Sequence, residues 1–153
     1  MTQPIAASAG APIRRAVALL DAIPYWLIAL IARAATCTVF WSSGTQKLSD
    51  WSATLALFES EYHVPLIPPH PAAYMATTIE ISCSVLVMLG LATRAAVLVL
   101  LGMTTVIEVF IYPGAWPTHI QWLAFMFVIL ARGPGKVSLD ALIGPRLFGG
   151  KAA

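Results

Sequence analysis

Four long apolar stretches, separated by short polar breaks, constrain this chain more than any other feature of its sequence. They cover residues 24–43, 72–91, 96–112 and 117–131. About 20 apolar residues in a helix cross the ~30 Å hydrocarbon core of a bilayer. Only 10% of the residues are charged, against roughly 25% in a soluble domain. The sequence therefore predicts an all-α integral membrane four-helix bundle, with residues 1–153 forming a single membrane domain.

The breaks between these stretches predict the parts that lie outside the membrane. Residues 44–71 form the longest break and contain HVPLIPPHP, whose prolines exclude a helix or a central strand. Residues 14–23 and 53–62 are amphipathic, which predicts short interfacial helices on the membrane surface. Gly133-Pro134-Gly135 ends the last apolar stretch, and residues 132–153 are predicted to form a cytoplasmic tail.

Basic residues are distributed unevenly between the two sides that these spans define. Four spans place both termini on one side, and on the other side Lys47 is the only lysine or arginine. By the positive-inside rule both termini of this multi-pass protein are cytoplasmic, and the opposite side faces the periplasm if the source is a Gram-negative bacterium. A net charge of +2 without a basic face argues against nucleic acid as a partner. The basic residues on the terminal side are Arg14, Arg15, Arg94, Arg132, Lys136, Arg146 and Lys151.

Three charged residues, Arg33, Glu80 and Glu108, fall inside the apolar stretches. Counted from the predicted outer ends at ~1.5 Å per residue, Arg33 and Glu80 lie at nearly the same depth. A charge in hydrocarbon is costly, so the sequence predicts that Arg33 pairs with Glu80. Such a pair either holds helices together or forms the floor of a site, and both interpretations stay open. Lys47 is predicted to pair with Asp50 across a turn of helix.

The segment MTTVIEVFIYPGAWPTHIQW, residues 103–122, holds the best candidate site. It places Glu108 inside apolar sequence and His119 just after a Pro-Gly turn. A neutral carboxyl beside a histidine relays protons or donates a hydrogen bond to a carbonyl, although Glu108 as a cap for a backbone group is an equal alternative. No catalytic residue is assigned. The candidate ligand-binding residues are Glu108, His119, Glu80, Arg33, Tyr112 and Trp116.

Cofactor motifs are absent from the sequence. The spacing of His63, His70 and His119 matches no standard metal-ligand pattern, so no metal site is predicted. The chain also has no dinucleotide or nucleotide-phosphate loop and no haem-type histidine pair within the spans. Trp116 and Trp122 are expected to lie at the membrane interface, or to wall a flat apolar ligand such as a quinone.

Several segments taken together resemble the DoxX family of small bacterial inner-membrane proteins. The resemblance runs from about Tyr25 to Ile143 and implies a four-helix membrane bundle. Related members are described as a membrane subunit of thiosulfate:quinone oxidoreductase, or as part of a membrane oxidoreductase complex in oxidative-stress defence. Others lie beside genes for modified metal-binding peptides. The segments are FWSSGTQKLSDW, EYHVPLIPPHPAAY, LGLATR, MTTVIEVFIYPGAWPTHIQW and ARGPGKVSLDALI.

Three functions are compatible with these observations. The first is a redox-linked subunit, non-autonomous as an enzyme, that binds quinone at an outward-opening polar pocket and works with a periplasmic or peripheral redox partner. The second is a component for transport or efflux of a small molecule, metal or peptide. The third is a non-catalytic scaffold that forms a homo-oligomer through small faces such as Ala92-Thr93 and Gly102.

Overall fold

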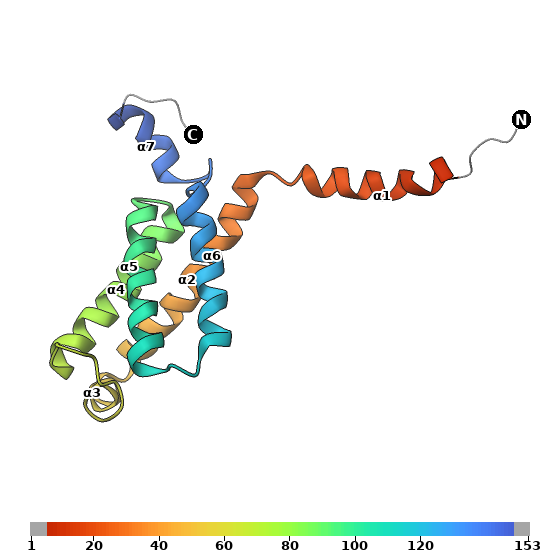
Figure 1. Cartoon of the computed structure of the whole chain (residues 1–153). Helices are drawn as coiled ribbons and strands as arrows, with labels where there is room; N and C mark the ends of the chain where they lie inside the picture. The colour runs from red at the N-terminus through yellow and green to blue at the C-terminus, as the bar shows by residue number, and fades with distance from the viewer. Residues whose placement is uncertain (1–5, 149–153) are drawn as a thin grey trace, which may run out of the picture.

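The structure, a computed structural model, describes residues 6–148 and is built from helices joined by short loops; this part of the chain contains no strand. The first helix, α1, and the last, α7, are far apart in sequence but lie at the same end of the molecule (Figure 1). The elements are α1 (Ala6–Asp21), α2 (Tyr25–Ser49), α3 (Trp51–Ser60), α4 (Pro69–Leu89), α5 (Thr93–Val106), the π-helical segment η1 (Ile107–Ile111), α6 (Trp116–Arg132) and α7 (Leu139–Phe148).

Three helical segments are long and apolar enough to cross a membrane: α2, α4, and α5 continued by η1. Their outer surfaces expose large apolar side chains, among them Ile31, Val85 and Leu98, which the hydrocarbon of a bilayer would cover. The chain is therefore a multi-pass membrane protein. The fourth predicted span, residues 117–131, corresponds to α6, which has 17 residues and is shorter than the other three segments.

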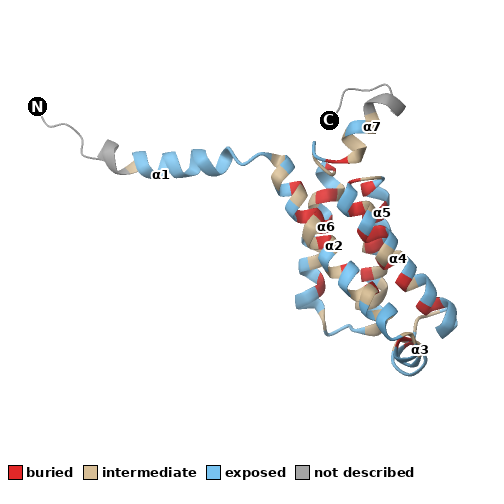
Figure 2. Ribbon diagram, turned by 180° about the vertical axis from the view of Figure 1, so that it is seen from behind, coloured by how far each residue is buried: buried red, intermediate tan, exposed pale blue. Residues whose placement is uncertain are grey.

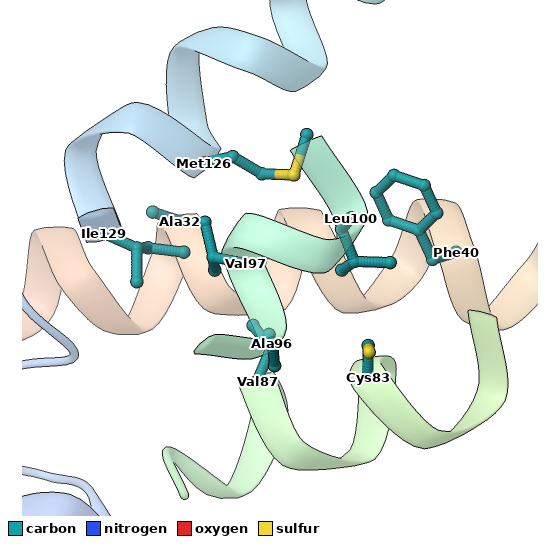
Figure 3. Close-up of a cluster of buried hydrophobic side chains, with 9 residues drawn as sticks. All are labelled: Ala32, Phe40, Cys83, Val87, Ala96, Val97, Leu100, Met126 and Ile129. Atoms are coloured by element: carbon teal, nitrogen blue, oxygen red, sulfur yellow. The ribbon is translucent and has the colours of Figure 1, made fainter. Parts of the chain in front are cut away.

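The four longest helical segments pack side by side. Helix α2 contacts α4 and α6, and α5 contacts the same two helices (Figure 1). Their shared interior is a tight apolar cluster in which Val87, Val97, Leu100, Met126 and Ile129 have no exposed surface. Figure 3 shows these side chains meeting between the ribbons. Packing of this density holds the helices in a fixed arrangement.

Helix α2 is longer than the sequence predicted, because it continues to Ser49 instead of ending at residue 43. The reason lies at Gly44, which is buried against α4. A Cβ atom there would lie 2.8 Å from Ile81 Cδ1 and 3.1 Å from Glu80 Cβ. Close backbone approach through a small residue stabilises contacts between membrane helices. The predicted loop 44–71 is therefore helical over much of its length, and α3 provides the surface helix expected at 53–62.

The two ends of the molecule differ. One, which we call the α3 end, holds α3, the start of α4 and the turn between η1 and α6 (Figure 1). The other, the α7 end, holds α7 and the junction between α1 and α2. Helix α1 projects away from the body and is exposed from Ala11 to Asp21 (Figure 2). It begins at Ala6, earlier than the helix predicted at residues 14–23. Residues 149–153 of the predicted tail lie outside the described residues.

Candidate functional site

A cavity of about 500 Å³ opens in the half of the molecule nearest the α3 end. Its walls come from every helical element between α2 and α6, and most of its lining side chains are apolar. Phe40 of α2 and Trp122 of α6 lie in its wall and pack edge to face, with ring centroids 5.8 Å apart. Polar groups interrupt the apolar lining in three places, described next.

The first polar group joins Lys47 and Ser43 of α2 to Glu80 of α4. Lys47 Nζ donates to both carboxylate oxygens of Glu80, at 2.8 and 2.9 Å, and the Ser43 hydroxyl donates to one of them at 3.0 Å. The Glu80 side chain is only 3% exposed and that of Lys47 16%. Ser43 and Lys47 face α4 together because they are four residues apart in one helix. All three line the cavity.

The predicted partners of these residues were wrong in two cases. Glu80 does not pair with Arg33, and Lys47 does not pair with Asp50. Asp50 instead begins α3, where its side chain accepts a hydrogen bond from the Ala53 N–H at 2.9 Å. This hydrogen bond lowers the pKa of the exposed Asp50 carboxyl below its ordinary value, as expected for a carboxylate at a helix N-terminus.

Arg33 lies in the other half of the molecule, near the α7 end. Its Nε donates to Val87 O at 2.8 Å and its Nη2 to Met88 O, at the end of α4. Its Nη1 donates to Val137 O at 2.5 Å and to Pro134 O at 3.3 Å, in the loop after α6. Depth counted from residue 43 placed Arg33 too near the α3 end, because α2 continues to Ser49. The guanidinium therefore binds backbone carbonyls at the end of α4 and in the loop after α6. It does not bind a carboxylate.

The second polar group in the cavity wall is the pair formed by His119 and Glu108. His119 Nδ1 and Glu108 Oε2 lie 2.5 Å apart, and the His119 side chain is 4% exposed. The His119 ring also packs on Trp122, with centroids 4.8 Å apart. Glu108 lies in η1, and π-helical segments inside α-helices frequently occur at functional sites. His119 lines the cavity, while Glu108 holds it through Nδ1.

The third polar group lies where α3 meets the end of η1. The Tyr112 hydroxyl donates to the Glu61 carboxylate, and the Tyr112 ring packs edge to face on Tyr62 with centroids 5.8 Å apart. Tyr62 packs in turn on Phe58 at 5.0 Å. The bond to Glu61 raises the pKa of the Tyr112 phenol above its ordinary value. Phe58, Tyr62 and Tyr112 all line the cavity, so aromatic side chains from α3, from the segment after it and from the end of η1 cover it.

The structure divides the six predicted ligand-binding residues into two sets. Glu80, Tyr112 and His119 line one cavity, and Glu108 contacts it through His119. Arg33 lies elsewhere, and Trp116 is 49% exposed and does not line the cavity. Sequence reasoning missed Lys47, since it placed that residue in a polar break. The i, i+4 spacing of Ser43 and Lys47, and the lack of proline between residues 44 and 64, were the available signals that α2 continues.

The described residues contain no group of three or more histidine, cysteine, aspartate or glutamate side chains arranged to hold a metal ion. Within this part of the chain, no buried side-chain nitrogen or oxygen lacks a hydrogen-bond partner. The buried polar side chains of the cavity are thus already hydrogen-bonded. A ligand would meet preformed ion pairs and hydrogen bonds, not isolated charges.

These features define a class: a small multi-pass membrane protein with an apolar-walled cavity that carries paired acidic and basic side chains near one end. The profile of the DoxX family matches residues 28–113, more than half of the chain. The chain belongs to the DoxX family, as its sequence motifs indicated. The matched region includes Lys47, Glu80 and Glu108, whereas His119 follows it. Comparisons with curated proteins and with solved structures gave no match.

Proposed function

We propose that this protein is a redox-linked membrane subunit that binds a quinone, or a similarly flat apolar molecule, in the cavity beneath α3. The observation that carries the proposal is the combination of a cavity of about 500 Å³ with apolar walls and two acid–base pairs. Small-molecule sites usually have volumes of about 300–1,000 Å³ and mostly apolar walls with a few polar groups that orient the ligand.

Each of the two pairs presents a basic side chain to the cavity, where it meets a quinone carbonyl in this proposal. Lys47 provides a cationic group from α2, which donates to both oxygens of Glu80 and to the Ser43 hydroxyl. A bound quinone carbonyl would accept one of these three N–H groups in place of its present partner. His119 provides an imidazole from α6, held by Glu108. Each donor is oriented by a carboxylate, which favours hydrogen bonding and proton exchange with a carbonyl oxygen. When bound, quinone would supply the two-electron chemistry, and a periplasmic or peripheral partner protein would exchange the electrons.

The proposal includes a membrane arrangement. Helix α6, with 17 residues, is ~25 Å long at ~1.5 Å per residue and would be a fourth span across a slightly thinned bilayer. Both termini would then lie on the cytoplasmic side of a bacterial plasma membrane, according to the positive-inside rule. The cavity would open toward the periplasmic side, near the headgroups, where a quinone ring is accessible from the lipid.

Binding within the membrane explains the cavity better than transport across it does. The cavity reaches Phe40 of α2. Between Phe40 and Arg33 the interior is filled by the apolar cluster that contains Leu100, Met126 and Ile129. Beyond this cluster, Arg33 connects the last turn of α4 to the loop after α6. A transport path would have to separate all these contacts.

The proposal is tested by titrating detergent-purified protein with a short-chain quinone and following quenching of tryptophan fluorescence. Trp122 lines the cavity, 4.8 Å from His119, so a bound ring would quench it. We expect saturable binding in the wild type. His119→Gln should weaken it about tenfold, because the ligand loses one hydrogen bond. His63→Gln, at an exposed loop histidine, is the matched control. Equal binding by both variants would reject the site.

A further inference from the structure

We propose that Arg94 and Arg132, gathered around Tyr25, form a binding site for the phosphate group of an anionic phospholipid. The site lies at the α7 end, away from the cavity, and does not depend on the proposed quinone site. It also does not depend on which side of the membrane the α7 end faces.

The first observation is that Tyr25 and Gly133 bring the two arginines together. The Arg132 guanidinium carbon lies 4.3 Å from the centroid of the Tyr25 ring, a cation–π contact. The Tyr25 hydroxyl donates to Gly133 O at 2.7 Å. Arg94, from α5, reaches the same glycine, because a Cβ atom on Gly133 would lie 3.5 Å from Arg94 Nη2.

The second observation is that no carboxylate balances this charge. Among the described residues, neither Arg94 nor Arg132 has a carboxylate within 4.0 Å, and neither side chain donates a hydrogen bond. The oxygens of Asp140, at the same end of the molecule, accept instead from Ala92 N, Thr93 N and the Thr93 hydroxyl at 2.7–2.9 Å. Two neighbouring cations without a partner favour an anion between them.

The third observation is the position of Arg94 in its helix. Arg94 lies in the first turn of α5, where the helix dipole is positive and a cation is unfavourable. The Asp140 carboxylate already accepts from the first N–H groups of α5, so an anion beside Arg94 would interact chiefly with the two guanidinium groups. Arg132 ends α6, which contacts α5, so the anion would bridge two neighbouring helices.

The fourth observation identifies the anion as a lipid headgroup. One turn from Arg94 toward the membrane, Leu98 is 55% exposed, and on α6 Phe127 is 58% exposed. Leu98 lies on a candidate membrane-spanning segment, and Phe127 lies on α6, which contacts that segment. A phosphodiester bound by the arginines would therefore extend its acyl chains over apolar side chains. Basic side chains between membrane helices are a recognised basis for binding anionic headgroups.

The test uses full-length protein in a non-ionic detergent, incubated with equal amounts of phosphatidylglycerol and phosphatidylcholine and examined by native mass spectrometry. We expect the wild-type protein to retain phosphatidylglycerol preferentially. Arg94→Gln/Arg132→Gln should reduce that preference about 25-fold, because each basic side chain near a lipid surface contributes roughly fivefold. The matched control is Arg14→Gln/Arg15→Gln, which removes the same charge from exposed positions of α1 and should keep the preference.

A photoactivatable phosphatidylglycerol on the wild-type protein keeps the test valid if the double variant fails to fold. Its cross-links should fall in peptides that contain Leu98 and Phe127. The inference would be overturned by cross-links confined to other surfaces, by equal losses in the two double variants, or by full displacement of the lipid with inorganic phosphate. That last result would indicate a site for free phosphate.

Discussion

The ion pair between Lys47 and Glu80 is the residue-level feature on which the candidate site depends most. Glu80 is 2% exposed, and Lys47 reaches it from the last turn of α2. A carboxylate at this depth needs a cation and further hydrogen bonds, which Lys47 and Ser43 provide. The sequence indicated that Glu80 requires a partner. It could not indicate which one, since that depended on where α2 ends.

Removal of the cation should therefore be more damaging than removal of the pair. We expect Lys47→Met to lower the free energy of unfolding by about 3–5 kcal/mol, because Glu80 stays buried without its partner. Lys47→Met/Glu80→Gln should recover most of the loss. Glu59→Gln, in the exposed pair with His70, should cost less than about 1 kcal/mol. Unfolding in mixed detergent micelles measures each value, and equal losses in the single and double variants would contradict the pairing.

The Tyr112 phenol should titrate above its ordinary value of 10.0 because it donates to Glu61. The folded-state pKa is raised, so the contribution of this contact to stability is complete below pH 10 and is lost as the pH rises above it. The phenolate absorbance of wild-type protein, minus that of Tyr112→Phe, should show this late titration. Glu61→Gln should move it back toward 10. A difference spectrum centred at or below the ordinary pKa in the wild type would show that the contact does not form.

At the scale of the elements, the length of α2 determined the success of the site prediction. The apolar stretch ends near residue 43, but the helix continues through SSGTQKLS to Ser49. Its continuation rests on a tertiary contact, the close packing of Gly44 on Glu80 and Ile81. Hydropathy reports burial in lipid and does not report such contacts between helices. Because the helix was predicted to end at residue 43, Arg33 was placed at the depth of Glu80, and the two were predicted to pair.

Helix packing at Gly44 gives the element-level prediction. Gly44→Leu should destabilise the protein by about 1–3 kcal/mol, since the new side chain overlaps Ile81 and Glu80. Gly102→Leu is the control, because a Cβ atom there meets nothing within 4 Å. It should be neutral or stabilising by up to ~1 kcal/mol from helix propensity. Thermal unfolding in detergent compares the two, and equal effects would mean that α2 and α4 do not approach each other at Gly44.

The π-helical segment η1 shows a second limit of the sequence. The sequence placed Glu108 and His119 near the same turn, and the structure brings them into contact. Nothing in the apolar pattern of residues 96–112 indicated that the helix changes to π geometry at Ile107. Side chains after that point are turned relative to a regular α-helix, so Tyr112 meets Glu61 of the α3 end. In a continuous α-helix, the side chains after Ile107 would point in other directions.

At the scale of the whole molecule, composition alone predicted a helical membrane protein, and the three candidate spans agree. The arrangement in the bilayer is tested by cysteines at Gly114 and Gly144, positions where a side chain meets nothing within 4 Å. Cys37 and Cys83 are first replaced by alanine. A membrane-impermeant thiol reagent, added to intact cells, should label the cysteine at 114 and spare the one at 144. Labelling of both, or of 144 alone, would mean that α6 does not cross as proposed or that the orientation is inverted.

The central claim is that the cavity beneath α3 binds quinone, and the most direct test fills that cavity without changing its charges. Met103 lines the cavity, whereas Leu98, on the same helix, is exposed on the outer surface. Quinone is measured by mass spectrometry in extracts of purified wild-type, Met103→Trp and Leu98→Trp proteins. We predict quinone in the wild type and in Leu98→Trp, and its loss from Met103→Trp. No quinone in the wild type, or equal amounts in both variants, would contradict the claim.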